Sequence, residues 1–208
     1  MKYKLVMFDF DGTLADSLPW FMSKLNILAG QYQFRTVQPA EMEALRGYDA
    51  KQIMKRLGIP FWKIPMIATH VRALLAQDIH QISLFQGVEQ LLHRLVKEGV
   101  QLALVTSNSE ANVRHVLGPV NAALIRYYEC GVSIFGKPAK IRNILRKSGI
   151  SHRQAMLIGD EIRDAEAARR AQIAFGAATW GYNSVESLKA QAPNYLFACV
   201  DDIYKHIL

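Results

Sequence analysis

The chain has 208 residues, half of them hydrophobic and 21% charged, with 7 Pro and 13 Gly, which excludes extensive disorder and more than two full domains. Its 25 Lys and Arg against 18 Asp and Glu give a formal charge of +7, which is compatible with nucleic-acid binding and with attraction of anionic substrates. The densest basic stretches lie at helical spacing beside apolar positions, which favours solvated helix faces.

Short β-type runs, each ending at a polar turn, recur along the chain. Residues 4–8 end at Asp9, residues 100–105 end at Thr106, and residues 155–158 end at Gly159-Asp160. Amphipathic helical patterns lie between these runs, near residues 88 and 141. This alternation predicts an α/β fold, with a mostly parallel, Rossmann-like, doubly wound sheet covered by helices on both faces.

Residues 17–83 break this rhythm. They contain helical patterns, for example around Trp20 and Val71, and no convincing strand. We therefore predict an all-helical insertion that returns to the core near Leu84-Phe85-Gln86-Gly87. The predicted core is then formed by residues 1–16 and 84–208.

The apolar runs of the chain are shorter than a membrane span, and the first of them is shorter than a signal-peptide core. Cys130 and Cys199 have neither CxxC nor Cys/His ligand spacing and predict buried free thiols in a reducing compartment. We therefore expect a cytoplasmic protein with no membrane partner.

Each predicted strand ends in polar residues that suit an anion or a metal ion: Asp9 and Asp11, then Thr106 and Ser107, then Asp160. Lys137 follows an apolar stretch, residues 132–135. The carboxyl ends of parallel strands meet at one edge of a sheet, where helix N-termini offer backbone amides. Together these residues predict one site for an anion and a metal.

The residue types suit phosphoryl transfer. A carboxylate can attack an anionic phosphate monoester only if cations neutralise the phosphoryl oxygens. Asp9 and Asp160 would hold a hard cation, and Lys137 would add a second positive charge. Asp11 can protonate the leaving oxygen and later deprotonate the water that splits the intermediate. The Thr106 hydroxyl and the amides after it would bind phosphate oxygens.

Other interpretations of these residues are weaker. An EF-hand needs Gly and Glu at its sixth and twelfth positions, which here are Leu14 and Trp20. Residues 131–137 are a near miss for a P-loop, but Pro138 stands where the metal-binding Ser or Thr should be. A structural alternative for Asp160 is that it caps the N-terminus of the helix that follows it.

Four groups of residues resemble, in order, the four motifs of the haloacid dehalogenase-like hydrolase superfamily: Asp9-Phe10-Asp11-Gly12-Thr13-Leu14, Thr106, Lys137 and Gly159-Asp160-Glu161-Ile162-Arg163-Asp164. The chain looks most like the phosphoglycolate phosphatase and β-phosphoglucomutase branch. In that branch a helical cap domain is inserted directly after the first motif, where residues 17–83 lie. The segment Leu45-Arg46-Gly47 resembles the substrate-specificity loop of the branch, so Arg46 is a candidate contact for a second anionic group of the substrate.

The resemblance implies a nucleophile at Asp9 and a general acid/base at Asp11. It implies Mg²⁺ held by Asp9, the Asp11 backbone carbonyl and Asp160. It also implies that Thr106, Ser107 and Lys137 bind the phosphate. Asp164 would support the metal site.

We predict a Mg²⁺-dependent phosphatase that hydrolyses the phosphate monoester of a small metabolite through an aspartyl-phosphate on Asp9, without a nucleic-acid partner. Asp11 argues against carbon–halogen chemistry, because the dehalogenases that named the superfamily lack this second acid. Two alternatives stay open: a phosphomutase like β-phosphoglucomutase, and a non-catalytic binding or regulatory protein on the same fold. The sequence assigns no oligomeric state.

Overall fold

A computed structural model of the chain describes residues 2–131 and 136–207. The apolar stretch 132–135, and with it most of the P-loop-like segment, lies outside the described residues. The core is a six-stranded parallel sheet with the order β3-β2-β1-β4-β5-β6. Its strands are β1 (Leu5–Phe8), β2 (Gln101–Val105), β3 (Ile125–Glu129), β4 (Ala155–Gly159), β5 (Ala174–Ala178) and β6 (Tyr195–Phe197).

The central strands are apolar on both faces, because helices cover both sides of the sheet. Every residue of β1 and β4 is buried. Leu5 of β1 pairs with Gln101 of β2 and Ala155 of β4, so the three strands run in register and end together. The residues that follow them are therefore brought to one edge of the sheet.

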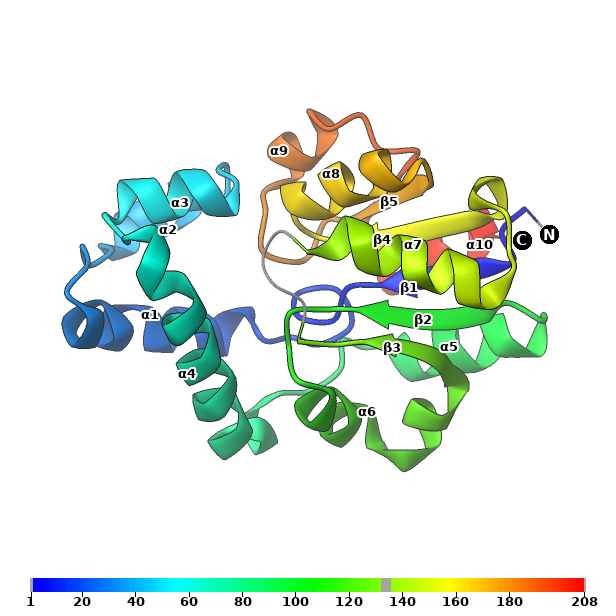
Figure 1. The fold of residues 1–208 in the computed structure, drawn as a ribbon, viewed down its shortest axis with the longest axis horizontal. Helices are drawn as coiled ribbons and strands as arrows, with labels where there is room; N and C mark the ends of the chain where they lie inside the picture. Colours follow the sequence, from blue (N-terminus) through cyan, green and yellow to red (C-terminus); the bar gives the residue numbers. More distant parts are fainter. Residues whose placement is uncertain (1, 132–135, 208) are drawn as a thin grey trace.

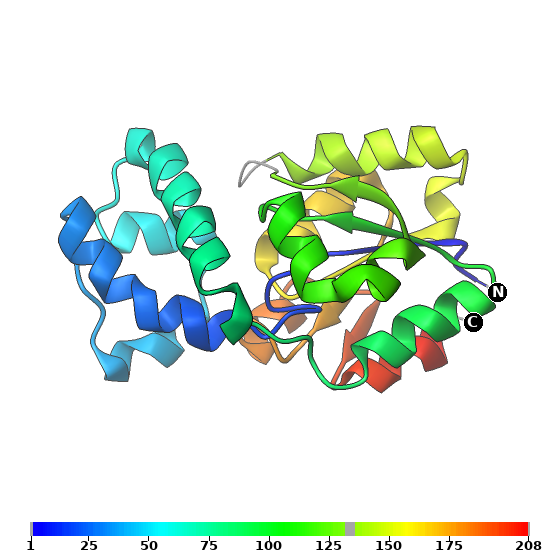
Figure 2. The same ribbon diagram turned by 90° about the horizontal axis from the view of Figure 1, so that it is seen from below.

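Helices form a layer on each face of the sheet (Figures 1 and 2). One apolar cluster joins Val6 and Phe8 to α5 (Val88–Lys97), α6 (Glu110–Leu124) and α10 (Val200–Ile207). A second joins Leu5 and Met7 to α7 (Lys137–Ser148), α8 (Ile162–Ala171) and α9 (Val185–Lys189). Alternate residues of β1 thus supply the two layers, as the period of a strand requires. A short 3-10 helix, η3 (His152–Gln154), precedes β4.

The segment between β1 and α5 contains helices and isolated bridges only and lies beside the carboxyl ends of the strands (Figure 1). It carries α1 (Leu18–Tyr32), α2 (Pro39–Leu45), α3 (Ala50–Arg56), η1 (Phe61–Lys63), α4 (Ile64–Gln77) and η2 (Ile79–Gln81). The chain leaves and returns side by side, since the Asp16 amide donates to the Ser83 carbonyl at 2.9 Å and the Phe85 amide to the Leu14 carbonyl at 2.9 Å. We call residues 17–83 the helical insertion.

The predicted fold class is confirmed, and the three predicted strands are β1, β2 and β4. The prediction missed β3, β5 and β6. β5 is built from Ala, Phe and Gly and β6 has three residues, so their pairing with neighbours decides their conformation more than their own β-propensity does.

The prediction of two buried thiols is wrong for Cys199, which is exposed in the turn between β6 and α10, while Cys130 is half-buried. Both cysteines are free. Among residues 2–131 and 136–207, no helix combines the length and the apolar character that a membrane span requires. The cellular location stays a prediction.

Candidate active site

The predicted site residues come together at the carboxyl edge of the sheet. Asp9 follows β1, Thr106 follows β2 and Asp160 follows β4. The strand order reverses direction at β1, which is the topological switch point where doubly wound sheets bind ligands. Lys137 and Asp164 reach the same place from the first turns of α7 and α8.

Asp9 lies at the centre of a buried ion-pair network. Its Oδ1 accepts a hydrogen bond of 2.7 Å from the Phe10 amide, and its Oδ2 lies 2.6 Å from Lys137 Nζ. Lys137 Nζ also donates to Asp164 Oδ1 at 2.5 Å. Burial opposes the charge of Lys137, but Asp164 and Asp9 outweigh it and raise the pKa of this lysine. Lys137 is therefore a fixed cation beside Asp9.

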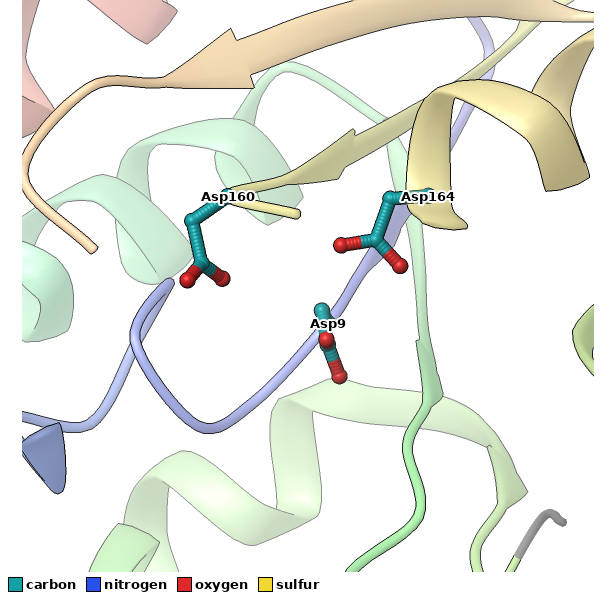
Figure 3. A group of neighbouring side chains, drawn as sticks. All are labelled: Asp9, Asp160 and Asp164. Atoms are coloured by element: carbon teal, nitrogen blue, oxygen red, sulfur yellow. The ribbon is translucent and has the colours of Figure 1, made fainter. Parts of the chain in front are cut away.

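Three buried carboxylates, those of Asp9, Asp160 and Asp164, offer oxygens that all lie within 4.8 Å of one another. Figure 3 shows the Asp160 and Asp164 side chains converging on Asp9 from the two sides. Burial and the nearby carboxylates of Glu161, Asp9 and Asp164 raise the pKa of Asp160 well above its usual range. Burial raises the pKa of Asp164 to about 6, even though Lys137 opposes the shift. Crowded, dehydrated carboxylates of this kind suit a hard divalent cation.

Asp160 is held by the loops around it and does not cap a helix. Its Oδ1 accepts from the Thr13 hydroxyl at 2.6 Å, and its Oδ2 accepts from the Tyr182 amide at 2.7 Å. The N-cap of α8 is Glu161, whose amide donates to Asp164 Oδ2 at 3.1 Å. The interpretation of Asp160 as a helix cap is therefore wrong.

A glycine makes room for Asp160. Gly12 has a φ of 76°, and a Cβ there would overlap the Asp160 carboxylate and the Tyr182 ring. Only glycine combines this left-handed conformation with so close an approach. Gly12 also lets the chain turn sharply after Phe10, whose carbonyl accepts from the Leu14 and Ala15 amides, both at 2.9 Å.

Asp11 is half-buried beside Asp9 and is oriented by two neighbours. Asn108 Nδ2 donates to both carboxylate oxygens, at 3.1 and 3.3 Å, and the nearby Ser17 hydroxyl lowers the pKa of the carboxyl. Burial, and then the charge of Asp9, raise the pKa of Asp11 to about 6. A carboxyl with a pKa near neutrality can both donate and accept a proton, as a general acid/base must.

The turn after β2 carries Thr106 and Ser107. Thr106 is fully buried, and its Oγ1 accepts from the Asn108 amide at 3.1 Å. The Ser107 carbonyl accepts from Arg72 Nη1, on α4 of the helical insertion, at 3.2 Å. This turn is thus fixed both within the core and from the insertion.

Arg46 contacts the core. Its Nε donates to the Tyr182 carbonyl at 3.1 Å and its Nη2 to the Gly181 carbonyl at 3.0 Å, while Asn183 Nδ2 donates to the Arg46 carbonyl at 2.7 Å. The guanidinium therefore joins the insertion to the loop after β5, and the candidate role of Arg46 in substrate contact stays a prediction.

Several residues around the site were not singled out from the sequence: Thr13, Ser17, Arg72, Asn108, Arg163 and Tyr182. Ser17 is the N-cap residue of α1, but its hydroxyl makes no capping hydrogen bond and lies 3.2 Å from the Tyr182 hydroxyl. Among the described residues, Arg163 Nε is buried without a hydrogen bond, and Asp9 Oδ2 is buried with the Lys137 ion pair as its polar contact. Buried polar atoms left without hydrogen bonds commonly mark a place where a ligand binds.

The chain is similar to proteins of one family. The family profile of the haloacid dehalogenase-like hydrolases matches residues 6–178. A phosphoglycolate phosphatase from Synechococcus elongatus is 30% identical over 203 residues, which cover 97% of this chain and 96% of the relative. One from Aliivibrio fischeri is 27% identical over 219 residues, which cover 99% and 95%.

Solved structures show the same fold. A haloacid dehalogenase-like family hydrolase from Streptococcus pneumoniae has a TM-score of 0.80 at 18% identity, covering 100% of this chain and 99% of that chain. The chain belongs to the haloacid dehalogenase-like hydrolase family. It is an enzyme, and the prediction of a phosphatase is confirmed.

Proposed function

We propose that this enzyme hydrolyses the phosphate monoester of a small metabolite through an aspartyl-phosphate on Asp9, with Mg²⁺ as its cofactor. One observation carries the proposal: the buried Asp9 carboxylate lies 2.6 Å from Lys137 Nζ and shares a site with Asp160 and Asp164. A carboxylate nucleophile next to a fixed cation and a divalent-cation site is what an anionic electrophile requires.

The donor set fits Mg²⁺. Asp9 and Asp160, with the Asp11 backbone carbonyl, would hold the ion, and Asp164 would support them through Lys137 and the Glu161 amide. When bound, Mg²⁺ supplies positive charge that neutralises the phosphoryl oxygens. The raised pKa values of Asp160 and Asp164 support this assignment, because they report carboxylates that lack enough nearby positive charge.

The reaction then has two steps. An Asp9 carboxylate oxygen attacks phosphorus, the bond from phosphorus to the leaving oxygen breaks, and Asp11 gives that oxygen its proton. Water next attacks the phosphorus of the aspartyl-phosphate while Asp11 takes a proton from it, which releases phosphate and restores Asp9. The pKa of Asp11, raised to about 6, suits both halves of this cycle.

The phosphoryl oxygens would be bound by Thr106, Ser107 and Lys137. Thr106 and Lys137 are buried at the same edge of the sheet as Asp9. Arg163 adds a cation whose pKa is raised because Glu161, Asp9 and Asp164 outweigh the effect of burial. Lys137 and Arg163, together with the proposed Mg²⁺, would supply the positive charge that a phosphate monoester requires beside a carboxylate nucleophile.

We also propose that residues 17–83 form a separate cap domain, with residues 1–16 and 84–208 as the core domain. The crossing at Asp16 and Ser83 supports these boundaries, because both connections lie side by side there. The insertion lies beside the carboxyl edge of the sheet, where the proposed catalytic residues lie and which we call the catalytic edge (Figure 2), and contacts it through Arg46 and Arg72. Such a domain would exclude bulk water during the reaction.

The names of the matched relatives support phosphoglycolate as the first substrate to test. The experiment measures phosphate release from a panel that includes phosphoglycolate and hexose phosphates, with wild type and Asp9→Asn, each with Mg²⁺ and with excess EDTA. Metal-dependent release by wild type alone is expected. More than a few per cent of activity in Asp9→Asn would overturn the nucleophile, and phosphate retained on a sugar bisphosphate would identify a mutase.

A further inference from the structure

The Asn108 side chain faces the Asp11 carboxylate. It is 3% exposed, and its Nδ2 spans both Asp11 oxygens, at 3.1 and 3.3 Å. Its backbone is fixed as well, because its amide donates to Thr106 Oγ1 at 3.1 Å and its carbonyl accepts from the Gly131 amide at 2.7 Å. Backbone and side chain together leave the Asn108 carboxamide little freedom.

The orientation of this carboxamide follows from its other partners. Asn108 Oδ1 accepts from the Ser109 amide at 2.8 Å and from Asn112 Nδ2 at 3.0 Å. Both partners are donors, so the oxygen must face them and the NH₂ group must face Asp11. The reversed carboxamide would set two donors against its NH₂ group and its oxygen against a carboxylate.

A neutral donor suits a group that must change its protonation state. A Lys or Arg in this place would favour the ionised carboxylate throughout the cycle. The Asn108 amide can hold the carboxyl in position in either state without adding a charge. Precise orientation matters because a misplacement of about 1 Å can reduce a rate about 100-fold.

We propose that Asn108 is a positioning residue that holds the Asp11 carboxyl in line for proton transfer to the leaving oxygen, with Asn112 fixing the Asn108 carboxamide. The inference rests on the proposed function, because it takes Asp11 as the general acid. It adds to the reaction a side chain whose role is to orient the general acid.

The same network reaches the helical insertion. Asn112 Nδ2 also donates to the Arg72 carbonyl on α4 at 3.2 Å, and Arg72 Nη1 donates to the Ser107 carbonyl at 3.2 Å. The position of α4 is thereby linked to the carboxamide that orients Asp11. Arg72→Ala removes the Nη1 bond to Ser107 but keeps the main-chain carbonyl that Asn112 contacts, so its effect is expected to be of the same kind as a change at Asn108 but smaller.

The test uses substrates that differ in how much they need a general acid. The three are phosphoglycolate, phenyl phosphate and 4-nitrophenyl phosphate, in order of falling basicity of the leaving oxygen, and kcat/KM reports the step in which that oxygen leaves. Asn108→Ala is expected to lower kcat/KM about 10- to 100-fold for phosphoglycolate, less for phenyl phosphate, and less than about 3-fold for 4-nitrophenyl phosphate. Asn108→Asp, which keeps the shape but turns an acceptor toward Asp11, should show the same gradient.

The matched control is Asn121→Ala. Asn121 is 5% exposed on α6 and donates to Glu89 Oε1 at 3.0 Å and to the Leu117 carbonyl at 2.9 Å, away from Asp11. It should lower kcat/KM equally for all three substrates, if at all. Thermal unfolding of each variant confirms that the compared proteins are folded.

The outcomes separate the inference from the proposed function. An equal loss for all substrates in both Asn108 variants, or no loss for phosphoglycolate, overturns the positioning role. If Asp11→Asn shows the gradient and the Asn108 variants do not, the inference alone fails. If Asp11→Asn shows no gradient either, Asp11 is not the general acid and both the inference and that part of the proposed mechanism fail.

Discussion

The catalytic edge of the sheet and the helical insertion use their polar and apolar residues in opposite ways. At the catalytic edge, charged side chains are buried, with Asp9 at 1%, Lys137 at 2% and Asp160 at 0% exposure. In the insertion, large apolar side chains are exposed, with Trp62 at 80%. The insertion has a small apolar cluster of its own around Leu25, Val37, Leu45 and Leu57.

The difference shows what fixes the geometry of each region. The ends of buried strands fix the geometry of the catalytic edge, so its charged side chains cannot move into solvent. Removing one partner of a buried ion pair therefore costs much stability. The insertion meets the core through its two connecting segments, through apolar side chains such as Trp20 and Leu75 that join the core cluster, and through polar contacts such as that of Arg72. Substitutions should therefore have large effects at the catalytic edge and small ones in the insertion.

The largest contrast is expected between two lysines of α7. Lys137→Met removes the cation that pairs with Asp9 and Asp164, so activity should fall at least about 1,000-fold and stability by about 3 kcal/mol. Lys147→Met removes an exposed lysine that lies 3.2 Å from Glu129, and its effect on stability should stay within about 0.5 kcal/mol. Urea unfolding and phosphate release measure both. Similar losses of stability and activity in the two variants would show that burial of the charge does not set the size of the effect.

A glycine pair compares the two regions directly. Gly12→Ala should lower activity about 100-fold and destabilise the fold, because the new Cβ would overlap the Asp160 carboxylate at a φ of 76°. Gly30→Ala, in α1, has no atom within 4 Å of the new Cβ. It should stabilise the protein by about 0.5–1 kcal/mol, because alanine has less freedom to lose in a helix. If Gly12→Ala changed neither activity nor stability, the side chains of the catalytic edge would be able to move and make room for the new Cβ.

Stability measured over a range of pH in the absence of metal tests whether the carboxylates of the site repel one another. The pKa of Asp11 is raised to about 6 from 3.8, so the native state binds its proton more tightly than the unfolded state does. The stability linked to this proton is full below pH 3.8 and is lost as the pH rises through about 6. In EDTA, Asp11→Asn should exceed wild type in stability at pH 8 by about 1–2 kcal/mol, allowing for solvent screening, with a smaller gain near pH 4. A gain that is the same at both pH values would exclude this origin.

The smallest effect is expected at the contact between insertion and core. Arg46→Ala removes the two hydrogen bonds to the Gly181 and Tyr182 carbonyls and an exposed ion pair with Glu43. It should change stability by less than about 1 kcal/mol. KM should rise a few-fold for phosphoglycolate, because the insertion would be held less firmly over the site. Arg35→Ala, which removes an exposed pair with Glu41 within the insertion, is the control and should leave KM unchanged. A loss of activity and stability in Arg46→Ala as large as that in Lys137→Met would contradict the expected difference between the insertion and the catalytic edge.

The chain by itself determined the α/β fold and the residues at the strand ends, because those signals are local. An apolar run followed by Asp9, or by Gly159 and Asp160, is visible within a few positions, and parallel strands necessarily bring their ends together. It also determined that residues 17–83 contain helices. Strand β5 and the edge strand β6 were not predicted, because their conformation depends on pairing with a neighbour.

Only the tertiary structure decided what surrounds the carboxylates of the proposed active site. Asn108 meets Asp11 across 97 positions of sequence, and Tyr182 meets Asp160 across 22. The Arg46 guanidinium lies on carbonyls 135 and 136 positions away. No local pattern predicts these partners, because a hydrogen bond between distant segments depends on how the sheet, the loops and the insertion are placed in space.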